Sequence, residues 1–283
     1  MHKKYNASVE INKITQNAII LRVFPDFPIR KFLPGQYGSL GLVSNFQKDK
    51  LIKRAYSIGS SILNDSNDSL VDQKNIKYLE FYINKVDKIN EKREQITPKL
   101  FSLKDGDRIF CGEKIVGHYI IKDIDRYDNI LLISTHTGES PNNTILNHIL
   151  KNYKNIKICN LNCSPSHNWP SLYTNKHNIL MEKNSNYNFI QKYDNNSYEK
   201  LTKFFDDYLI NKDETASQIG FKFNKENILI MLCGDPKMIG APIKKGGWEY
   251  EYPDSGLIKS FEKFGLELST RFKKGNIVHE SYW

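Results

Sequence analysis

The sequence predicts a two-domain protein of the β plus α/β class, an antiparallel β-barrel over residues 1–126 followed by a parallel-sheet α/β domain over residues 127–283. In the first part, apolar and polar residues alternate with the period of half-buried strands. After the polar stretch 125–128 the apolar runs become continuous and alternate with helix-like segments, which is typical of βαβ units. At 283 residues, each part is long enough to bury a core of its own.

Short strands and turns account for the first domain. The segments 19–24 and 79–84 alternate in character along the chain, and we expect a further strand from Arg54 to Ser60. Pro34-Gly35 and the stretch 104–107 are turn sequences. Strands of this length joined by turns favour a small antiparallel barrel.

Strands and helices alternate in the second domain. The run 130–133 is typical of a parallel strand covered on both faces, and Ser140-Pro141 suits the start of a helix. The unit then repeats, with strands predicted over 156–161, 187–193 and 228–233 and a helix over 197–210. The segment 245–254 has no period, so we interpret it as a loop that either meets a partner or packs on the surface.

Composition excludes several classes of function. Lys and Arg number 41 against 32 Asp and Glu, a net charge of +9, but the basic residues are dispersed, so we expect no nucleic-acid partner. The charge suits an acidic protein partner or solubility alone. The four cysteines and seven histidines have no metal-ligand spacing, so no metal is expected. With no apolar run long enough for a membrane span and no signal peptide, we expect a cytoplasmic protein.

The first domain carries residues suited to a bound diphosphate and a flat ring. Arg54-Ala55-Tyr56-Ser57 follows the turn 34–37, Pro-Gly-Gln-Tyr. A guanidinium pairs with a diphosphate through two parallel donors, and a tyrosine ring offers a stacking face. A strand with a surface arginine and a core tyrosine is the alternative. Thr97 stands at a predicted helix start, where its hydroxyl suits an anion or caps the helix.

The second domain places candidate residues where predicted strands end. The loop Thr135-His136-Thr137-Gly138 lies between a strand and a helix, a position at which backbone N–H groups suit phosphates. Another strand ends at Cys233-Gly234-Asp235-Pro236, and the sequence finishes with 280–283, Glu-Ser-Tyr-Trp. Two aromatic residues at 282 and 283 are unusual for a frayed end.

Taken in order, these segments resemble the ferredoxin/flavodoxin–NADP reductase family of the bacterial type. The resemblance implies an FAD-binding barrel and an NAD(P)-binding α/β domain whose aromatic tail returns to the flavin. It places on FAD the residues Arg54, Ala55, Tyr56, Ser57, Tyr82, Ile83, Lys85, Thr97, Tyr282 and Trp283. It places on NADP(H) or NAD(H) the residues Thr135, His136, Thr137, Gly138, Lys192, Gly234, Asp235 and Pro236.

The same resemblance implies an NAD(P)H-dependent flavoprotein oxidoreductase. A hydride would pass between NADPH and FAD, followed by single electrons to ferredoxin or flavodoxin, with Tyr56, Ser57, Cys233 and Tyr282 at the reacting rings. Cys233 would act by packing and positioning rather than as a nucleophile. The expected assembly is a monomer.

Two departures from the family pattern leave alternatives open. His136 stands where the family has glycine, and the stretch 163–173 has no arginine for a 2′-phosphate. Lys192 stands at the position of another family arginine and Lys203 lies nearby in sequence, and these lysines only half support NADP over NAD. The alternatives are a flavin-binding protein with a degenerate nucleotide site, or a ferric or flavin reductase of the same fold.

Overall fold

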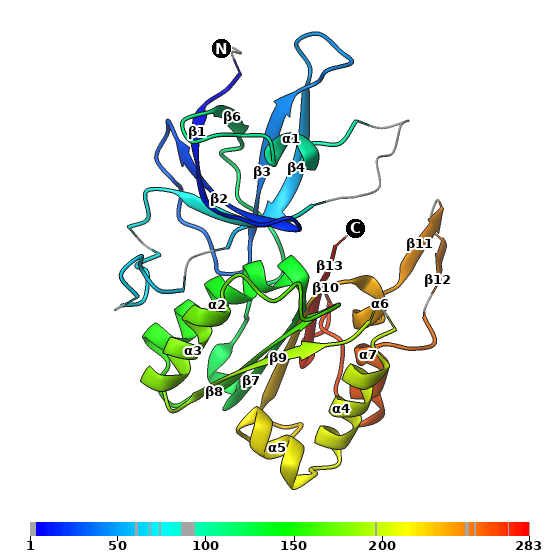
Figure 1. Cartoon of the computed structure of the whole chain (residues 1–283). Coiled ribbons are helices and arrows are strands. Elements are labelled where there is room, and N and C mark those ends of the chain that lie inside the picture. Colours follow the sequence, from blue (N-terminus) through cyan, green and yellow to red (C-terminus); the bar gives the residue numbers. More distant parts are fainter. Residues whose placement is uncertain are drawn as a thin grey trace.

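The structure is a computed structural model that describes residues 4–59, 62–67, 69–73, 75–85, 94–195, 197–246, 249–251, 253–270, 272–282, and at 243, 244, 246, 249 and 250 only the backbone. Two main sheets lie one above the other in Figure 1, with helices packed around the lower one. None of the helices in these ranges combines the length and apolar character needed to cross a bilayer.

The first sheet is antiparallel and is closed by a backbone bridge. Its described strands run in the order β4-β3-β6-β1-β2-β5. Just beyond β4, the Gly59 N–H donates to the carbonyl of Glu80 on β5 at 2.7 Å, which joins the two edges. The strands are β1 (Ala7–Ile14), β2 (Ala18–Pro25), β3 (Tyr37–Val43), β4 (Leu51–Ser57), β5 (Leu79–Asn84) and β6 (Arg108–Cys111). The predicted antiparallel barrel is therefore confirmed, with its core around Leu21, Leu40 and Phe81.

The second sheet is parallel and follows the order β13-β10-β7-β8-β9. Its strands are β7 (Asn129–Thr135), β8 (Lys157–Ser164), β9 (Tyr187–Tyr193), β10 (Ile228–Gly234) and β13 (Ile277–Ser281). The α-helices are α1 (Thr97–Leu100, beside the barrel), α2 (Glu139–Asn152), α3 (Thr174–Lys183), α4 (Glu199–Leu209), α5 (Asp213–Ile219), α6 (Pro236–Ile239) and α7 (Leu257–Lys263). Two short 3-10 helices, η1 (Ile124–Arg126) and η2 (His136–Gly138), precede and follow β7. This confirms the predicted α/β class, and the predicted division at 126/127 falls between η1 and β7.

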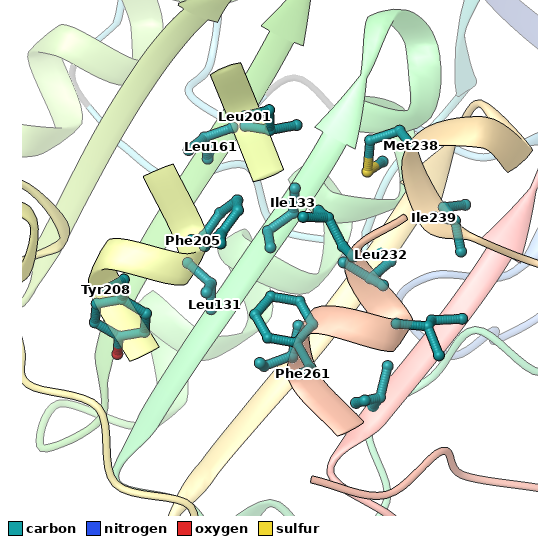
Figure 2. Packing of buried hydrophobic residues seen from close by; sticks show 14 of the residues in the cluster. Leu131, Ile133, Leu161, Leu201, Phe205, Tyr208, Leu232, Met238, Ile239 and Phe261 are labelled. Carbon is teal, nitrogen blue, oxygen red and sulfur yellow. The ribbon is translucent and has the colours of Figure 1, made fainter. Parts of the chain in front are cut away.

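Both faces of this sheet are buried, which explains the continuous apolar runs. Leu131 and Ile133 face one side and pack with Phe205 of α4 and Phe261 of α7 (Figure 2). Ile130 and Leu132 face the other side, in a cluster with the buried residues of α2 and α3. Successive strand residues point to opposite faces, so a strand covered on both sides has no polar alternation.

Helix α2 is buried along most of its length because it packs between its own sheet and the barrel (Figure 1). The Gly35 N–H donates to Thr144 Oγ1 at 2.9 Å, and the Ser140 hydroxyl donates to the Ser57 carbonyl at 3.1 Å. Asn147 Nδ2 donates to two barrel-side carbonyls, those of Ile62 and Val71, both at 3.1 Å. The polar residues of this helix thus hold the two sheets together.

Two expectations are corrected. The strand expected at Arg54 to Ser60 begins at Leu51 and ends at Ser57, so the Arg-Ala-Tyr-Ser motif lies at the end of β4. The segment expected to be a loop forms a projecting hairpin of β11 (Ile243–Gly246) and β12 (Glu249–Glu251), as Figure 1 shows. Such a ribbon pairs its own backbone groups and includes a Lys245–Glu251 ion pair, so it needs no apolar period.

Candidate functional site

A cavity of about 1050 Å³ lies between the barrel and the carboxyl ends of the parallel strands. Its walls come from three widely separated parts of the sequence. These are the end of β4 with β5 and α1, the η2 loop after β7, and the ends of β10 and β13. The lining residues are Tyr37, Arg54, Ala55, Tyr56, Ser57, Tyr82, Ile83, Asn84, Thr97, Thr135, His136, Thr137, Gly234, Asp235, Pro236, Glu280, Ser281 and Tyr282. Cofactor and nucleotide sites of open α/β sheets are found at this edge.

The barrel wall presents an arginine and a tyrosine on the same face of β4. Arg54 and Tyr56 are two residues apart, so both side chains point to the cavity. The Tyr56 hydroxyl lies 3.3 Å from Thr97 Oγ1, and burial raises the pKa of Tyr56. Thr97 does not cap α1 through its side chain, because the helix has no side-chain cap and the Thr97 hydroxyl meets Tyr56 instead.

The wall formed by the η2 loop packs directly against the end of β10. A Cβ at Gly138 would lie 2.3 Å from the Cys233 carbonyl oxygen, so the loop can pack this closely only with glycine there. The Asp235 N–H donates to Thr135 Oγ1 at 2.8 Å, which ties the two strand ends together. His136 adopts a left-handed backbone with φ of 49°. His136 therefore adopts the left-handed backbone conformation that is usual for glycine.

The third wall brings the C-terminal strand against β4. In Figure 1, β13 rises from the parallel sheet toward the barrel. The Tyr282 N–H donates to the Gly234 carbonyl at 2.8 Å, and the Tyr282 hydroxyl donates to Ser57 Oγ at 2.5 Å. Cys233 pairs with Glu280 across the β10–β13 ladder and lies fully buried beneath the cavity, where burial raises its thiol pKa well above the ordinary value.

Glu280 is the titratable group of this wall that the sequence interpretation left unassigned. Burial raises its pKa to about 7, an effect that the nearby Ser57 hydroxyl partly opposes. Its Oε2 atom is buried without a hydrogen-bond partner among the described residues. Carboxyls with raised pKa values in a cleft are candidates for handling protons. The sequence feature that could have identified Glu280 is its position close to the aromatic residues 282 and 283.

A second, smaller cavity of about 320 Å³ opens at the carboxyl end of β9. Three of its lining residues are lysines, Lys192, Lys200 and Lys203. The Lys192 ammonium lies 4.1 Å from the ring centre of Phe204 and donates to Gln218 Oε1 at 3.2 Å, and burial lowers the pKa of Lys192. The three lysines share this cavity with Asp194 and Asp207 and lie two strands from the η2 loop, about 10 Å along the sheet edge.

Comparison with known proteins agrees with this arrangement. No protein-family model matches the chain. It is 26% identical to the flavodoxin/ferredoxin–NADP reductase of Buchnera aphidicola subsp. Schizaphis graminum over 100% of both chains, and 24% identical to that of Buchnera aphidicola subsp. Baizongia pistaciae over 97% and 96%. The chain is related to the flavodoxin/ferredoxin–NADP reductases. The resemblance inferred from the motifs is thereby confirmed.

Solved structures of reductases have the same fold as this chain. A ferredoxin NADP+ reductase from Neisseria gonorrhoeae with bound FAD and NADP superposes with a TM-score of 0.72 at 15% identity, covering 98% of each chain. The cytochrome b5 reductase domain of Ulva prolifera nitrate reductase superposes with a TM-score of 0.64 at 14% identity, covering 99% of this chain and 98% of that one. The barrel followed by a five-stranded parallel sheet is therefore the reductase fold.

Most of the predicted site residues line the large cavity. Four of the predicted residues that the structure describes do not. Gly138 and Cys233 lie beneath its surface, Lys192 lines the second cavity, and Lys85 is exposed beyond the end of β5. Trp283 lies outside the described residues, as do Trp248 and Tyr252 of the hairpin segment. Tyr37, Asn84, Glu280 and Ser281 line the cavity without having been predicted. The role of each residue stays a prediction.

Proposed function

We propose that this chain is an FAD-dependent ferredoxin/flavodoxin–NADP+ reductase. The observation that carries the proposal is the single cavity in which the β4 motif, the η2 loop and Tyr282 meet, on a chain related over its whole length to such reductases. The proposed reaction is hydride exchange between NADPH and FAD, followed by one-electron transfer to a small acidic carrier protein.

The residues present fit FAD. The cavity exceeds the size of a typical site for one drug-sized molecule, and it offers a guanidinium, stacking faces and hydroxyls. Arg54 would pair with the diphosphate, and Tyr56 and Tyr282 would enclose the flat ring. The flavin, when bound, supplies the ability to accept a hydride and release electrons one at a time.

The chain's own residues would orient the reacting rings and exclude water. The Tyr282 hydroxyl holds Ser57 Oγ, which keeps the C-terminal strand closed over the end of β4. Gly234 and Asp235 leave an open wall at the end of β10, where a nicotinamide would enter. Glu280 would hold a proton at its unpaired Oε2 atom next to this wall.

The lysine cluster supports a preference for NADP. Diphosphate oxygens would lie against the η2 loop, near Thr135 and Thr137, which line the large cavity. The adenosine half would then extend along the sheet edge to Lys192, Lys200 and Lys203. Ammonium groups supply positive charge to a 2′-phosphate, without the paired donors of arginine.

We also propose a cytoplasmic monomer that works with ferredoxin or flavodoxin. The net charge of +9 would raise the rate of encounter with an acidic carrier. The four cysteines at 111, 159, 163 and 233 are free and buried, as is usual in a reducing compartment.

The test is an anaerobic absorption spectrum of the purified protein before and after NADPH, with NADH in parallel. We expect a bound-flavin spectrum that bleaches faster with NADPH. Arg54→Ala and Tyr56→Ala should lose flavin, whereas Arg30→Ala, an exposed arginine of the same domain, should retain it. Wild-type flavin content in both site variants would contradict the flavin assignment.

Two observations favour a second candidate, a flavin-binding protein whose nucleotide site is degenerate. His136 replaces the glycine of the family's loop, and 163–173 contains no arginine. Bound flavin that neither NADPH nor NADH reduces would support this candidate.

A further inference from the structure

His136 is a cavity-lining side chain in an unusual backbone conformation. Its φ of 49° lies in the left-handed region, which costs a non-glycine residue energy, and His136 is the cavity-lining non-glycine residue with this conformation among those described. The loop holds this conformation through the His136 carbonyl, which accepts from Asn162 Nδ2 at 3.1 Å. The ring packs edge-on against Trp169, with centres 4.7 Å apart. The imidazole is therefore held at one place on the cavity wall.

The imidazole has polar capacity that the protein does not use. Nδ1 is buried and has no hydrogen-bond partner among the described residues. A buried polar atom without a partner is costly, so a bound group that supplies one gains affinity. The neighbours of the ring in the sequence, Thr135 and Thr137, line the same cavity, at the place proposed for the nucleotide's diphosphate.

The groups around the ring leave it neutral when no anion is bound. Burial lowers the pKa of His136, and Asp235, at the end of β10, opposes that effect. Glu139 of α2 is directed away, toward His177 Nε2 at 2.6 Å and the Ser171 hydroxyl at 2.5 Å. On the strands that pack against η2, burial raises the pKa values of Tyr82 of β5, Cys163 of β8 and Cys233 of β10, so these groups are uncharged at neutral pH. Two charged residues of the same strands are engaged or placed elsewhere: Glu80 of β5 pairs with Arg22 and Tyr173, and Lys157 lies at the opposite end of β8.

We propose that His136 takes up a proton from solvent when a dinucleotide diphosphate binds, and that the resulting imidazolium recognises the diphosphate. This inference rests on the proposed function. A diphosphate places two negative charges beside a ring that one carboxylate already faces, which favours the charged form. Nucleotide affinity then includes a contribution from His136 that is large at low pH and disappears at high pH, because the bound state carries the additional proton.

The experiment compares wild-type protein with His136→Asn between pH 6.0 and 8.5, using NADP+ as the ligand and flavin difference spectra as the readout. Asparagine accepts left-handed backbone and keeps a polar side chain that does not titrate. His118→Asn, at an exposed position, is the matched control. The ratio of the variant and wild-type dissociation constants cancels two other titrations near pH 7, those of the 2′-phosphate and of Glu280.

We expect His136→Asn to bind NADP+ about 10-fold more weakly at pH 6.0 and within about 2-fold of wild type at pH 8.5, the size of one charged hydrogen bond. The control should match wild type throughout. Calorimetry in two buffers of different ionisation enthalpy should show greater proton uptake by wild type than by His136→Asn.

Three results would overturn the inference. A ratio that does not change with pH would assign His136 a packing role against Trp169. Tighter binding by His136→Asn, or by His136→Gly as a second variant without backbone strain, would show a degenerate site. Wild-type protein that holds flavin but binds no NADP+ at any pH would reject the proposed function itself, and the inference with it.

Discussion

Replacing Glu280 by glutamine should stabilise the protein at alkaline pH and leave it unchanged in acid. Burial raises the pKa of this carboxyl from an ordinary value of 4.5 to about 7. The unfolded chain then releases the proton at lower pH than the folded protein does, so the folded state binds more protons between pH 4.5 and 7, and stability falls as pH rises through that window. At about 1.4 kcal/mol per pH unit, the ionised carboxylate costs about 3 kcal/mol above pH 7. Below pH 4.5 both states are protonated and the cost vanishes.

The assay is urea unfolding of wild type and Glu280→Gln at pH 4.5 and pH 8.5, at equal cofactor loading. We expect the variant to gain about 2 to 3 kcal/mol at the higher pH, with partial exposure of the carboxyl reducing the full value, and nothing at the lower pH. Glu113→Gln, an exposed barrel residue, is the control and should show no pH-dependent gain. An equal effect of Glu280→Gln at both pH values would refute the reasoning, because it would separate the effect from ionisation.

Further predictions concern three other contacts. Tyr173→Phe removes a 2.7 Å donor from the buried Glu80 carboxylate, so the free energy of unfolding in urea should fall by about 1 to 3 kcal/mol, and an unchanged value would contradict the burial argument. Gly138→Ala places a methyl group 2.3 Å from the Cys233 carbonyl oxygen, so thermal unfolding should show a loss of about 1 to 3 kcal/mol together with weaker NADP+ binding. Lys192→Ala should raise the KM for NADPH about 10-fold and leave that for NADH unchanged, whereas equal effects on both would place the 2′-phosphate elsewhere.

Much of the fold could be predicted from local sequence patterns because the pattern of apolar residues depends on which faces of an element are buried. The continuous run 130–133 reflects a strand covered on both faces. The segments 19–24 and 79–84 were expected to be half-buried strands, and this expectation is wrong. Both faces of β2 and β5 are buried, because Ile20 and Tyr82 pack with Tyr173 on the side opposite the barrel core. The motif residues of the second domain could be grouped from sequence because the carboxyl ends of parallel strands lie at one edge. The loop expected over 245–254 was wrong because the backbone groups of a two-stranded hairpin pair with each other, which requires no apolar period.

By itself, then, the sequence determined the two sheets, their order along the chain and the segments that supply a nucleotide-type site. Only the tertiary structure decided which side chains meet. Ser57 and Tyr282 are 225 positions apart and form one hydrogen bond, and the shift in the pKa of Glu280 depends on burial between β10 and β4. Three lysines, one from β9 and two from α4, line one cavity only because the folded chain places α4 beside the end of β9. Periodicity encodes which face of an element is buried, whereas such meetings depend on strand order, register and packing between distant segments, which no local pattern records.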